Sequence, residues 1–209
     1  MPRRRSLSTA AIAAAALAVL DRDGTAGLSM RAVAAELGVG TMSLYRYVSD
    51  RGDLERLVVD LVLAPVDTSV AGHLPWPDRV ADLAGRTRVA AAAHPAAIPL
   101  LLAHRHAAPN SWRWSEAVLA ALTEAGFTGQ ARVIALRCLV SYITGALQAE
   151  YLGPLGGPGT NVLAALSPDS YPLLAETARS ARAVPPDQEF GLGLEILLRG
   201  LRASLTRQS

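Results

Sequence analysis

The break Gly38-Val39-Gly40 constrains the fold of this chain more than any other stretch of its sequence. Before it, apolar residues recur at helical spacing after Ser29, whose hydroxyl can accept a hydrogen bond from a free backbone amide and so begin a helix. After it, a second short helix is predicted from Gly40 or Thr41 through Val48. A short break that contains glycine is typical of a tight joint between two crossing helices.

Another predicted helix precedes this pair and completes a small helical unit. It begins at Ser6 or Ser8 and ends at Asp23-Gly24, and its apolar residues follow the helical period. Four apolar residues around the glycine break are assigned to the core that the three helices share: Leu37, Val39, Leu44 and Val48.

Helix, glycine turn and short second helix together predict a helix-turn-helix, whose second helix enters the major groove of DNA by its N-terminal part. Residues 1–49 contain six arginines and three acidic residues, whereas the whole chain has a net charge of only +2. Arg3, Arg4 and Arg5 could reach phosphates or the minor groove, or could simply form a solvated end. Charge alone does not identify a nucleic-acid binder, so the prediction depends on the motif.

Residues 28–58 closely resemble the DNA-binding domain of the TetR family of repressors, through Leu37-Gly38-Val39, Leu44-Tyr45, Tyr47-Val48 and Leu54. The resemblance implies that Arg31 and the start of the second short helix reach base edges, and we expect Arg46 to read a base. It implies that hydroxyl and guanidinium groups farther along contact phosphates. The residues implicated are Arg31, Thr41, Met42, Ser43, Tyr45, Arg46, Tyr47, Ser49 and Arg51. Packing inside the domain remains an alternative role for Tyr45.

The remainder of the chain is also predicted to be helical, so the expected fold class is all-α. A helix begins at Asp50 or Asp53, runs to about Leu63 and is stopped by Pro65. We expect a three-helix helix-turn-helix domain over residues 1–50 and a helical ligand-binding and dimerisation domain over residues 51–209. The later helices are predicted at about 77–93, 95–104, 110–126, 129–152, 169–181 and 187–206, with Trp76 anchoring the first of them and residues 152–167 forming a loop.

The C-terminal half resembles the tetracycline-repressor branch of the same family, through WPDRVADLAGRTRVAAAAHP, EAGF, LQAE and FGLGLEILLRGL. This resemblance implies that the helices near 129–152 and 187–206 meet their twofold mates in a four-helix bundle. An apolar stripe in the last helix also favours a partner helix, although an intramolecular core remains the alternative. The stripe comprises Phe190, Leu194, Leu197, Leu198 and Leu201, beside Gly191, Gly193 and Gly200, which allow close approach.

Six residues of the C-terminal domain are candidates for an apolar small-molecule site with few polar groups. They are Leu101, His104, Trp112, Trp114, Phe127 and Tyr142, and a plain hydrophobic core is the alternative for most of them. His104 and His106 precede Pro109 after an apolar helix. In tetracycline-binding relatives a histidine near the corresponding bend coordinates a drug-bound metal, and His104 is the closer match by its distance from the proline. Because the other ligand positions do not line up clearly, we expect no metal and no cofactor.

The sequence shows no pattern typical of an enzyme, such as a nucleophile elbow, a phosphate loop or paired carboxylates. The single cysteine, Cys138, can form no internal disulfide and has no zinc-binding partner, which indicates a reducing cytoplasm. The longest apolar run, Ala10 to Leu20, falls short of the roughly 20 residues that a spanning helix needs. We therefore expect a cytoplasmic protein that does not associate with a membrane.

The expected function is that of a homodimeric repressor that binds a palindromic DNA operator and is released by a small-molecule inducer. Two recognition helices must span half-sites about 34–36 Å apart, so a ligand that favours a different spacing would empty the operator. A ligand-independent DNA-architectural protein and an activator remain alternatives. The sequence identifies neither the inducer nor the operator.

Overall fold

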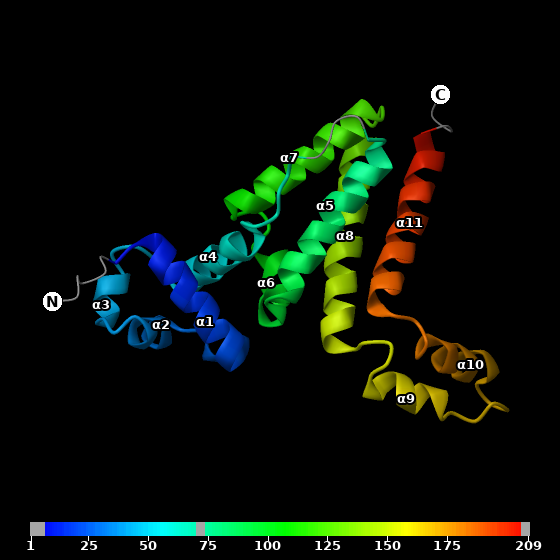
Figure 1. The fold of residues 1–209 in the computed structure, drawn as a ribbon, viewed down its shortest axis with the longest axis horizontal. Coiled ribbons are helices and arrows are strands. Elements are labelled where there is room, and N and C mark those ends of the chain that lie inside the picture. Colours follow the sequence, from blue (N-terminus) through cyan, green and yellow to red (C-terminus); the bar gives the residue numbers. More distant parts are fainter. Residues whose placement is uncertain (1–6, 70–73, 206–209) are drawn as a thin grey trace. The chain divides into compact units, whose positions relative to one another are not determined.

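The computed structural model describes residues 7–69 and 74–205, and every regular element in these two stretches is a helix (Figure 1). The all-α fold class is thereby confirmed. The elements are α1 Thr9–Gly27, α2 Met30–Glu36, α3 Thr41–Leu44, α4 Arg51–Leu63, α5 Trp76–Ala92, the 3-10 helix η1 Pro95–Ala97, α6 Ile98–Ala103, α7 Pro109–Glu124, α8 Gly129–Leu152, α9 Pro158–Ala164, α10 Pro172–Ala181 and α11 Pro186–Leu205.

The chain divides into two compact units, each of which takes residues from two separate stretches. The first unit comprises Met1–Ser69 and Arg86–Ala117. The second comprises Val70–Gly85 and Val118–Ser209.

The first unit begins with a helix whose N-terminus is capped as the sequence predicts. The Ala11 N–H donates to the Ser8 hydroxyl at 3.2 Å, which satisfies one of the free amides of the first turn. The alternative cap, Ser6, lies outside the described residues, as do Arg3, Arg4 and Arg5. The helical backbone breaks at Gly24, and α1 continues beyond this kink to Gly27.

The joint between α2 and α3 has the tight geometry that the glycine break predicts. Gly38 has a φ of +66°, a left-handed conformation that glycine adopts without the steric cost of a Cβ. The Val39 N–H donates to the Ala34 carbonyl at 3.0 Å, and the Gly38 N–H donates to the Ala35 carbonyl at 3.1 Å. This pair of bonds is the Schellman arrangement that ends a helix and satisfies its last carbonyls.

The second short helix is shorter than the sequence predicts. Regular α-helix stops at Leu44, and residues 45–47 form a turn instead of continuing the helix to Val48. The physical reason is that the Leu44 carbonyl accepts from both the Tyr47 N–H, at 2.8 Å, and the Val48 N–H, at 3.0 Å. The sharing tightens the last turn, after which the chain becomes extended at Asp50, the N-cap of α4.

The core that joins α1 to α4 consists of aliphatic side chains. Leu44 and Val48 are buried, as predicted for the shared core, whereas Leu37 and Val39, assigned to the same core, are half-buried. Leu37 is the C-cap residue of α2, and Val39 lies in the joint between α2 and α3. The fully buried positions are Ile12, Ala16, Val19, Leu20, Leu28, Val33, Leu44, Leu54, Val58 and Val59.

In the second unit the long helices α8 and α11 pack against each other (Figure 1). The Tyr142 hydroxyl of α8 donates to the Phe190 carbonyl of α11 at 2.7 Å. Gly193 makes room for this tyrosine, because a Cβ there would lie 2.3 Å from the Tyr142 oxygen.

The apolar stripe of α11 faces the interior of its own chain. Phe190, Leu194, Leu198 and Leu201 are buried within a single copy. The prediction that this stripe needs a partner helix is therefore wrong, and the alternative of an intramolecular core is confirmed. Spacing along one helix shows that a face is apolar but does not show which neighbour covers it.

The prediction of a loop over residues 152–167 is also wrong, because α9 spans Pro158–Ala164 and packs on α10. Pro158 occupies the first turn of α9, where the missing proline N–H leaves no hydrogen bond unmade and the fixed φ suits a helix. No residue of α9 is buried. Pro172 similarly lies in the first turn of α10, which begins three residues after the predicted start at residue 169.

Two contacts join the start of α5 to the end of α7 and the turn that follows it, in the second unit. Trp76 packs edge-on against Phe127, with ring centroids 5.7 Å apart, as expected of an anchor. Arg79 is buried and forms an ion pair with Glu124.

Candidate functional site

The recognition segment, residues 41–51, lies on the surface of the first unit while its anchoring side chains point inward. Met42 is 78% exposed, Tyr45 is 49% exposed and Tyr47 is 45% exposed, whereas Leu44 and Val48 are buried. These exposures disfavour a purely structural role for Tyr45. All nine residues predicted to contact DNA are exposed or half-buried: Arg31, Thr41, Met42, Ser43, Tyr45, Arg46, Tyr47, Ser49 and Arg51.

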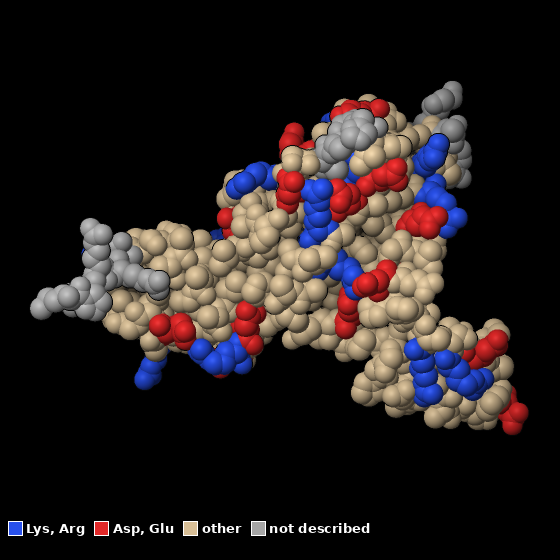
Figure 2. Space-filling view, viewed as in Figure 1, with Lys and Arg blue, Asp and Glu red and all other residues tan. Residues whose placement is uncertain are grey.

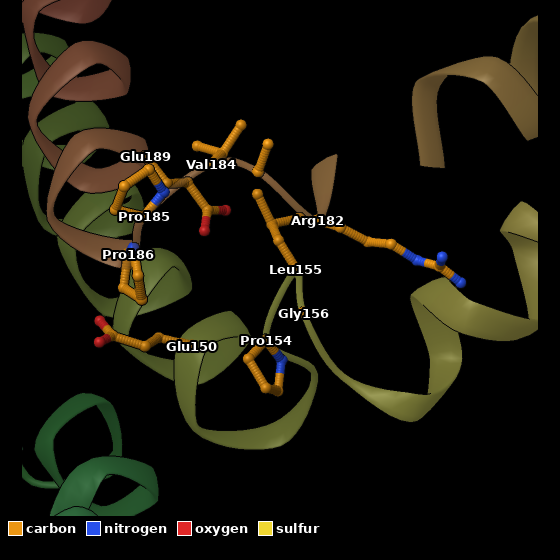
Figure 3. Close-up of a pocket in the computed structure, with 10 residues that line it drawn as sticks. Glu150, Pro154, Leu155, Gly156, Arg182, Val184, Pro185, Pro186 and Glu189 are labelled. Carbon is orange, nitrogen blue, oxygen red and sulfur yellow. The ribbon is translucent and has the colours of Figure 1, made fainter. Parts of the chain in front are cut away.

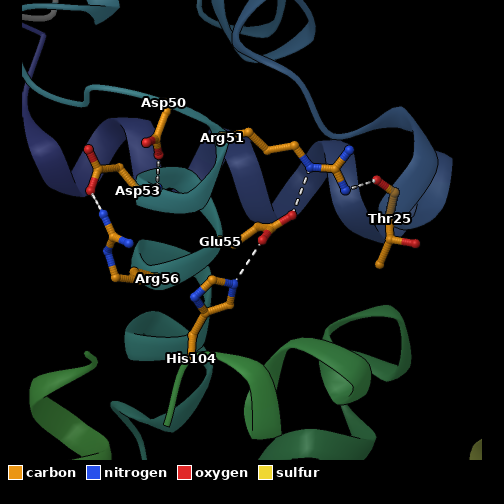
Figure 4. A network of polar contacts seen from close by, with 7 residues as sticks. All are labelled: Thr25, Asp50, Arg51, Asp53, Glu55, Arg56 and His104. Atoms are coloured by element: carbon orange, nitrogen blue, oxygen red, sulfur yellow. Dashed lines mark hydrogen bonds and ion pairs between the residues drawn. The ribbon is translucent and has the colours of Figure 1, made fainter. Parts of the chain in front are cut away.

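The N-terminus of α4 holds the end of the recognition segment in place. The Asp50 carboxylate accepts from the Asp53 N–H at 2.9 Å, and the Asp53 carboxylate accepts from the Ser49 N–H at 2.6 Å. Asp53 also forms an ion pair with Arg56 (Figure 4). Negative charge is favoured at a helix N-terminus, so this arrangement stabilises the sharp turn that follows Val48.

Arg51 is the one residue of the recognition segment whose side-chain charge is paired within the described part of the chain. Its Nε donates to Glu55 Oε1 at 2.7 Å, and its Nη2 donates to the Thr25 carbonyl at 2.8 Å. The second oxygen of Glu55 lies 2.8 Å from His104 Nε2, at the C-cap of α6 (Figure 4). The three side chains thus form a chain of contacts from the recognition segment to α6.

Basic and acidic side chains are interspersed on the face drawn in Figure 2, and no large patch of one sign is visible there. This matches the net charge of +2. Side-chain type and position, more than overall charge, define the candidate DNA-binding surface.

The six candidate ligand residues are divided between the two units. Leu101, His104, Trp112 and Trp114 belong to the first unit. Leu101 and Trp114 are buried there, whereas Trp112 is 55% exposed and its Nε1–H donates to the His106 carbonyl at 2.9 Å.

Phe127 and Tyr142 belong to the second unit and have partners in its core. Burial raises the pKa of the Tyr142 hydroxyl above its ordinary value, and the charge of Glu189 adds to this effect.

Two cavities in the second unit are lined by other residues. One, of about 340 Å³, lies where the end of α8 meets the linker between α10 and α11 (Figure 3). Its wall includes three prolines and the carboxylates of Glu150 and Glu189, and the guanidinium of Arg182 points away from both (Figure 3). The other cavity, of about 350 Å³, lies between α5 and α11. Neither contains any of the six candidate ligand residues.

Within residues 7–69 and 74–205 there is no group of three or more histidine, cysteine, aspartate and glutamate side chains that could hold a metal ion. His104, the candidate with a metal-binding counterpart in relatives, has its Nε2 against Glu55. The acidic neighbour of this histidine is therefore a residue that helps to hold Arg51.

One helix of the described chain, α8, is long and apolar enough to cross a membrane by length and composition, and 22% of its apolar window is buried. Arg132 and Arg137 interrupt its sequence, so α8 is not among the long continuous apolar runs of the chain. Much of the apolar surface of α8 is consequently left uncovered by its own chain.

Glu55 is the residue of the surface that sequence reasoning missed. Its spacing of four residues from Arg51 is the helical ion-pair spacing and could have indicated the first contact. Its contact with His104 joins residues 49 positions apart, and no local pattern signals it.

Comparison with known proteins places both parts of the chain. Residues 8–54 match the family described as bacterial regulatory proteins, tetR family, and residues 71–205 match the tetracyclin repressor-like C-terminal domain. The HTH-type transcriptional repressor DrrR1 of Streptomyces coeruleorubidus is 29% identical over 208 residues, which cover 93% of this chain and 77% of DrrR1. An HTH-type transcriptional regulator of Saccharopolyspora erythraea is 39% identical over 140 residues, covering 66% of this chain and 59% of that protein.

Solved structures of ActR from Streptomyces coelicolor share the fold over nearly the whole chain. The apo form gives a TM-score of 0.84 at 27% identity, covering 97% of this chain and 98% of ActR. The complex of ActR with actinorhodin gives a TM-score of 0.82 at 27% identity, covering 96% of this chain and 97% of ActR. The helices that carry the recognition segment and those of the second unit thus both have counterparts in ActR.

Proposed function

Because the chain belongs to the TetR family of bacterial transcriptional regulators, we propose that it acts as a homodimeric repressor, binds a palindromic DNA operator and leaves it when a small molecule binds. Members of this family are DNA-binding regulators and not enzymes. The observation that carries the proposal is the exposed recognition segment, in a chain whose structural relative ActR has been solved with bound small molecules. DNA-bound regulation places the proposed activity in the cytoplasm.

The proposed DNA-binding domain covers residues 1–50, and the proposed ligand-binding and dimerisation domain covers residues 51–209; one DNA contact, Arg51, stands at the start of the second. Arg46 and Arg31 read base edges, because a guanidinium matches the two acceptors of guanine in the major groove. Thr41, Met42 and Ser43 lie at the start of α3, where a helix enters the groove. Phosphate contacts that fix the register come from Tyr45, Tyr47, Ser49 and Arg51.

The proposed dimer uses the outward faces of α8 and α11. Their inward faces are already covered within one chain, and the outward faces carry mainly apolar and small residues at helical spacing, with Arg137 the charged member of the α8 face. Such faces would meet their twofold mates in a four-helix bundle. The residues are Val133, Ile134, Ser141, Gly145 and Ala149 of α8, and Leu192, Ile196, Gly200 and Ala203 of α11.

The proposed inducer is a small molecule. The candidate residues for its contacts are Leu101, His104, Trp112 and Trp114 in the first unit, and Phe127 and Tyr142 in the second. Two recognition helices must fit half-sites about 34–36 Å apart, so a ligand that binds another spacing more tightly empties the operator. To change the protein from mostly DNA-bound to mostly released, the ligand must bind the released conformation about 5 kcal/mol more tightly than the DNA-binding conformation. Helix α4 is the proposed lever, because it begins at the recognition segment and packs against α6.

Operator selection tests the DNA-binding part of this proposal. The purified full-length protein is mixed with random duplex DNA, and bound sequences are recovered over several rounds. We expect an inverted repeat whose half-sites match the spacing of a twofold dimer. The Arg46→Ala protein should lose this enrichment and remain dimeric. Weak enrichment without a repeat would support a DNA-architectural protein and contradict the proposal.

Ligand challenge of the recovered complex tests the second part. Actinorhodin is the first probe, because ActR has been solved in complex with it, and a wider set of small molecules follows. Release of the DNA by any of them supports induction, whereas a complex that resists all of them supports a ligand-independent protein. Expression of a reporter gene controlled by the selected operator should rise when the gene for this protein is deleted. A fall in expression would indicate an activator.

A further inference from the structure

We propose that Glu55 is a positioning residue that holds Arg51 ready for a DNA phosphate, and that His104 links this hold to α6. The inference rests on the proposed function, because it requires that the recognition segment grips DNA. It assigns to His104 a coupling role through Glu55, in addition to any contact with an inducer.

Arg51 is fixed from two sides before DNA arrives. One hydrogen bond goes to the carboxylate of Glu55, at 2.7 Å, and the other goes to the carbonyl of Thr25, at 2.8 Å (Figure 4). A guanidinium has five N–H donors, so Nη1 and one hydrogen on Nη2 remain for another acceptor. The side chain is 48% exposed, which leaves these donors accessible to a phosphate. A cation held in this way loses less conformational freedom when it binds DNA.

Glu55 uses both of its oxygens for these contacts. Oε1 accepts from Arg51, and Oε2 lies 2.8 Å from His104 Nε2. The carboxylate is enclosed, since the side chains of Glu55 and His104 are only 15% and 17% exposed. With little water nearby, these two partners determine the direction in which the carboxylate points, and therefore the place at which it holds Arg51.

His104 connects the carboxylate to the end of α6. It is the C-cap residue of that helix, and its backbone N–H donates to the Leu100 carbonyl at 2.9 Å. Helix α6 packs against α4 within the same compact unit. A displacement of the end of α6 would therefore release one oxygen of Glu55 and loosen the hold on Arg51. This relay runs through side chains and needs no rotation of the whole recognition segment.

A double-mutant cycle in the full-length protein tests the relay. Binding to a labelled duplex that carries the selected operator, and to an unrelated duplex of equal length, is measured from 50 to 200 mM salt for Arg51→Ala, Glu55→Gln, His104→Gln and their pairs. Phosphate contacts do not depend on the base sequence, so the coupling between the substitutions can be measured with either duplex. His106→Gln is the matched control, because His106 is exposed two residues from His104 and only its backbone carbonyl forms a hydrogen bond with Trp112.

The Arg51→Ala protein should bind on the order of tenfold more weakly, with the salt slope reduced by about 1. Glu55→Gln should weaken binding roughly two- to tenfold, the cost of ordering one freed long side chain. His104→Gln should act in the same direction. Neither substitution should have a further effect once Arg51 is alanine, and His106→Gln should bind as the unmodified protein does.

Tighter binding by Glu55→Gln would mean that the carboxylate competes with phosphate, and would overturn the inference. Losses that simply add to that of Arg51→Ala would do the same, because they would indicate general damage to the fold. Thermal melting followed by circular dichroism identifies such damage directly. A protein that binds no duplex overturns the proposed function itself, whereas duplex binding with an additive cycle overturns only the relay.

Discussion

Asp60 of α4 caps the first turn of α7 by binding Asn110 at two points. Its carboxylate accepts from the Asn110 backbone N–H at 2.7 Å, and its carbonyl accepts from the Asn110 side-chain amide at 2.9 Å. Ala108, which precedes α7, has no side-chain oxygen that could serve as a cap. The cap therefore comes from a different helix, and it joins α4 to α7 within the first unit.

We expect the Asp60→Ala protein to lose about 1–2 kcal/mol of its free energy of unfolding. The first-turn amide of α7 would lose its acceptor, and this is the typical cost of removing an N-cap. Urea denaturation followed by circular dichroism measures the loss. Glu116→Ala, at an exposed position of the same helix, is the control and should change stability little. Equal stability of the two variants would contradict the capping role.

Gly38→Ala should destabilise the protein by about 1 kcal/mol or more. The φ of +66° is strained for any residue with a Cβ, even though the space around Gly38 is open. Gly85→Ala is a control of opposite sign. That position is inside α5 without a positive φ and has nothing within 4 Å, so alanine should stabilise the helix by up to about 1 kcal/mol. Thermal melting of both proteins shows whether the two signs differ.

Glu124→Gln should destabilise the protein more than Arg79→Met does. The first substitution removes the charge that compensates the buried Arg79 guanidinium and leaves only an amide oxygen as acceptor; because the Glu124 side chain is 60% exposed to water, the cost should be about 1 kcal/mol. The second removes the charge and keeps an apolar stem, and replacing a buried charge by an apolar side chain is often close to neutral. Arg79 Nε has no hydrogen-bond partner within the described residues, which favours this order. Urea denaturation of both variants checks it, and the reverse order would contradict the argument.

Tyr142→Phe should lower the free energy of unfolding by about 1 kcal/mol at pH 7, because it removes the hydrogen bond to the Phe190 carbonyl. Burial raises the pKa of the folded-state hydroxyl above the unfolded value of 10.0. The tyrosine contribution should therefore be complete below pH 10 and decrease as the pH rises toward the folded-state pKa. Urea denaturation between pH 8 and pH 11 should show the difference between the two proteins shrinking above about pH 10. A difference that grows with pH would contradict this assignment.

Ile196→Arg should convert the proposed dimer into a monomer of 21.9 kDa. The side chain is 63% exposed on the outward face of α11, and two arginines would meet across the twofold axis without compensation. Light scattering after size-exclusion chromatography measures the mass. Val89→Arg, at an exposed apolar position of α5, should leave the mass unchanged. A dimer that survives Ile196→Arg would contradict the proposed interface.

The sequence predicts best those features that neighbouring residues determine. The caps at Ser8, Ser29 and Asp50 and the turn at Gly38 depend on hydrogen bonds within a few residues, and the structure contains all four. The helices α4, α5, α7, α8 and α11 lie within two residues of their predicted bounds for the same reason, whereas the segment predicted as one helix over 95–104 is divided into η1 and α6.

Features that depend on distant residues were not predictable in this way. The apolar stripe of α11 is covered by its own chain, and the contact between Glu55 and His104 links helices far apart in sequence. Helix α9 lies in the segment predicted to be a loop, and Pro158 stands in its first turn, where proline favours a helix. For the candidate site, the sequence predicted side chains that the structure leaves exposed or half-buried, and their contacts with DNA stay a prediction. It could not show that Arg51 is already engaged.

The composition of the first unit has a consequence for engineering. The α1–α4 helices share their unit with residues 86–117, through the packing of α1 on η1 and of α4 on α6. Polar contacts between the two stretches include that of His94 Nδ1 with the Asp21 carboxylate, at 2.8 Å, and the hydrogen bond from the Asn110 N–H to the Asp60 carboxylate. A chimera that grafts only the first 69 residues onto another regulator would leave these partners behind and open the apolar surface of α4 to water. Transplanting the operator preference of this protein therefore requires both stretches to travel together.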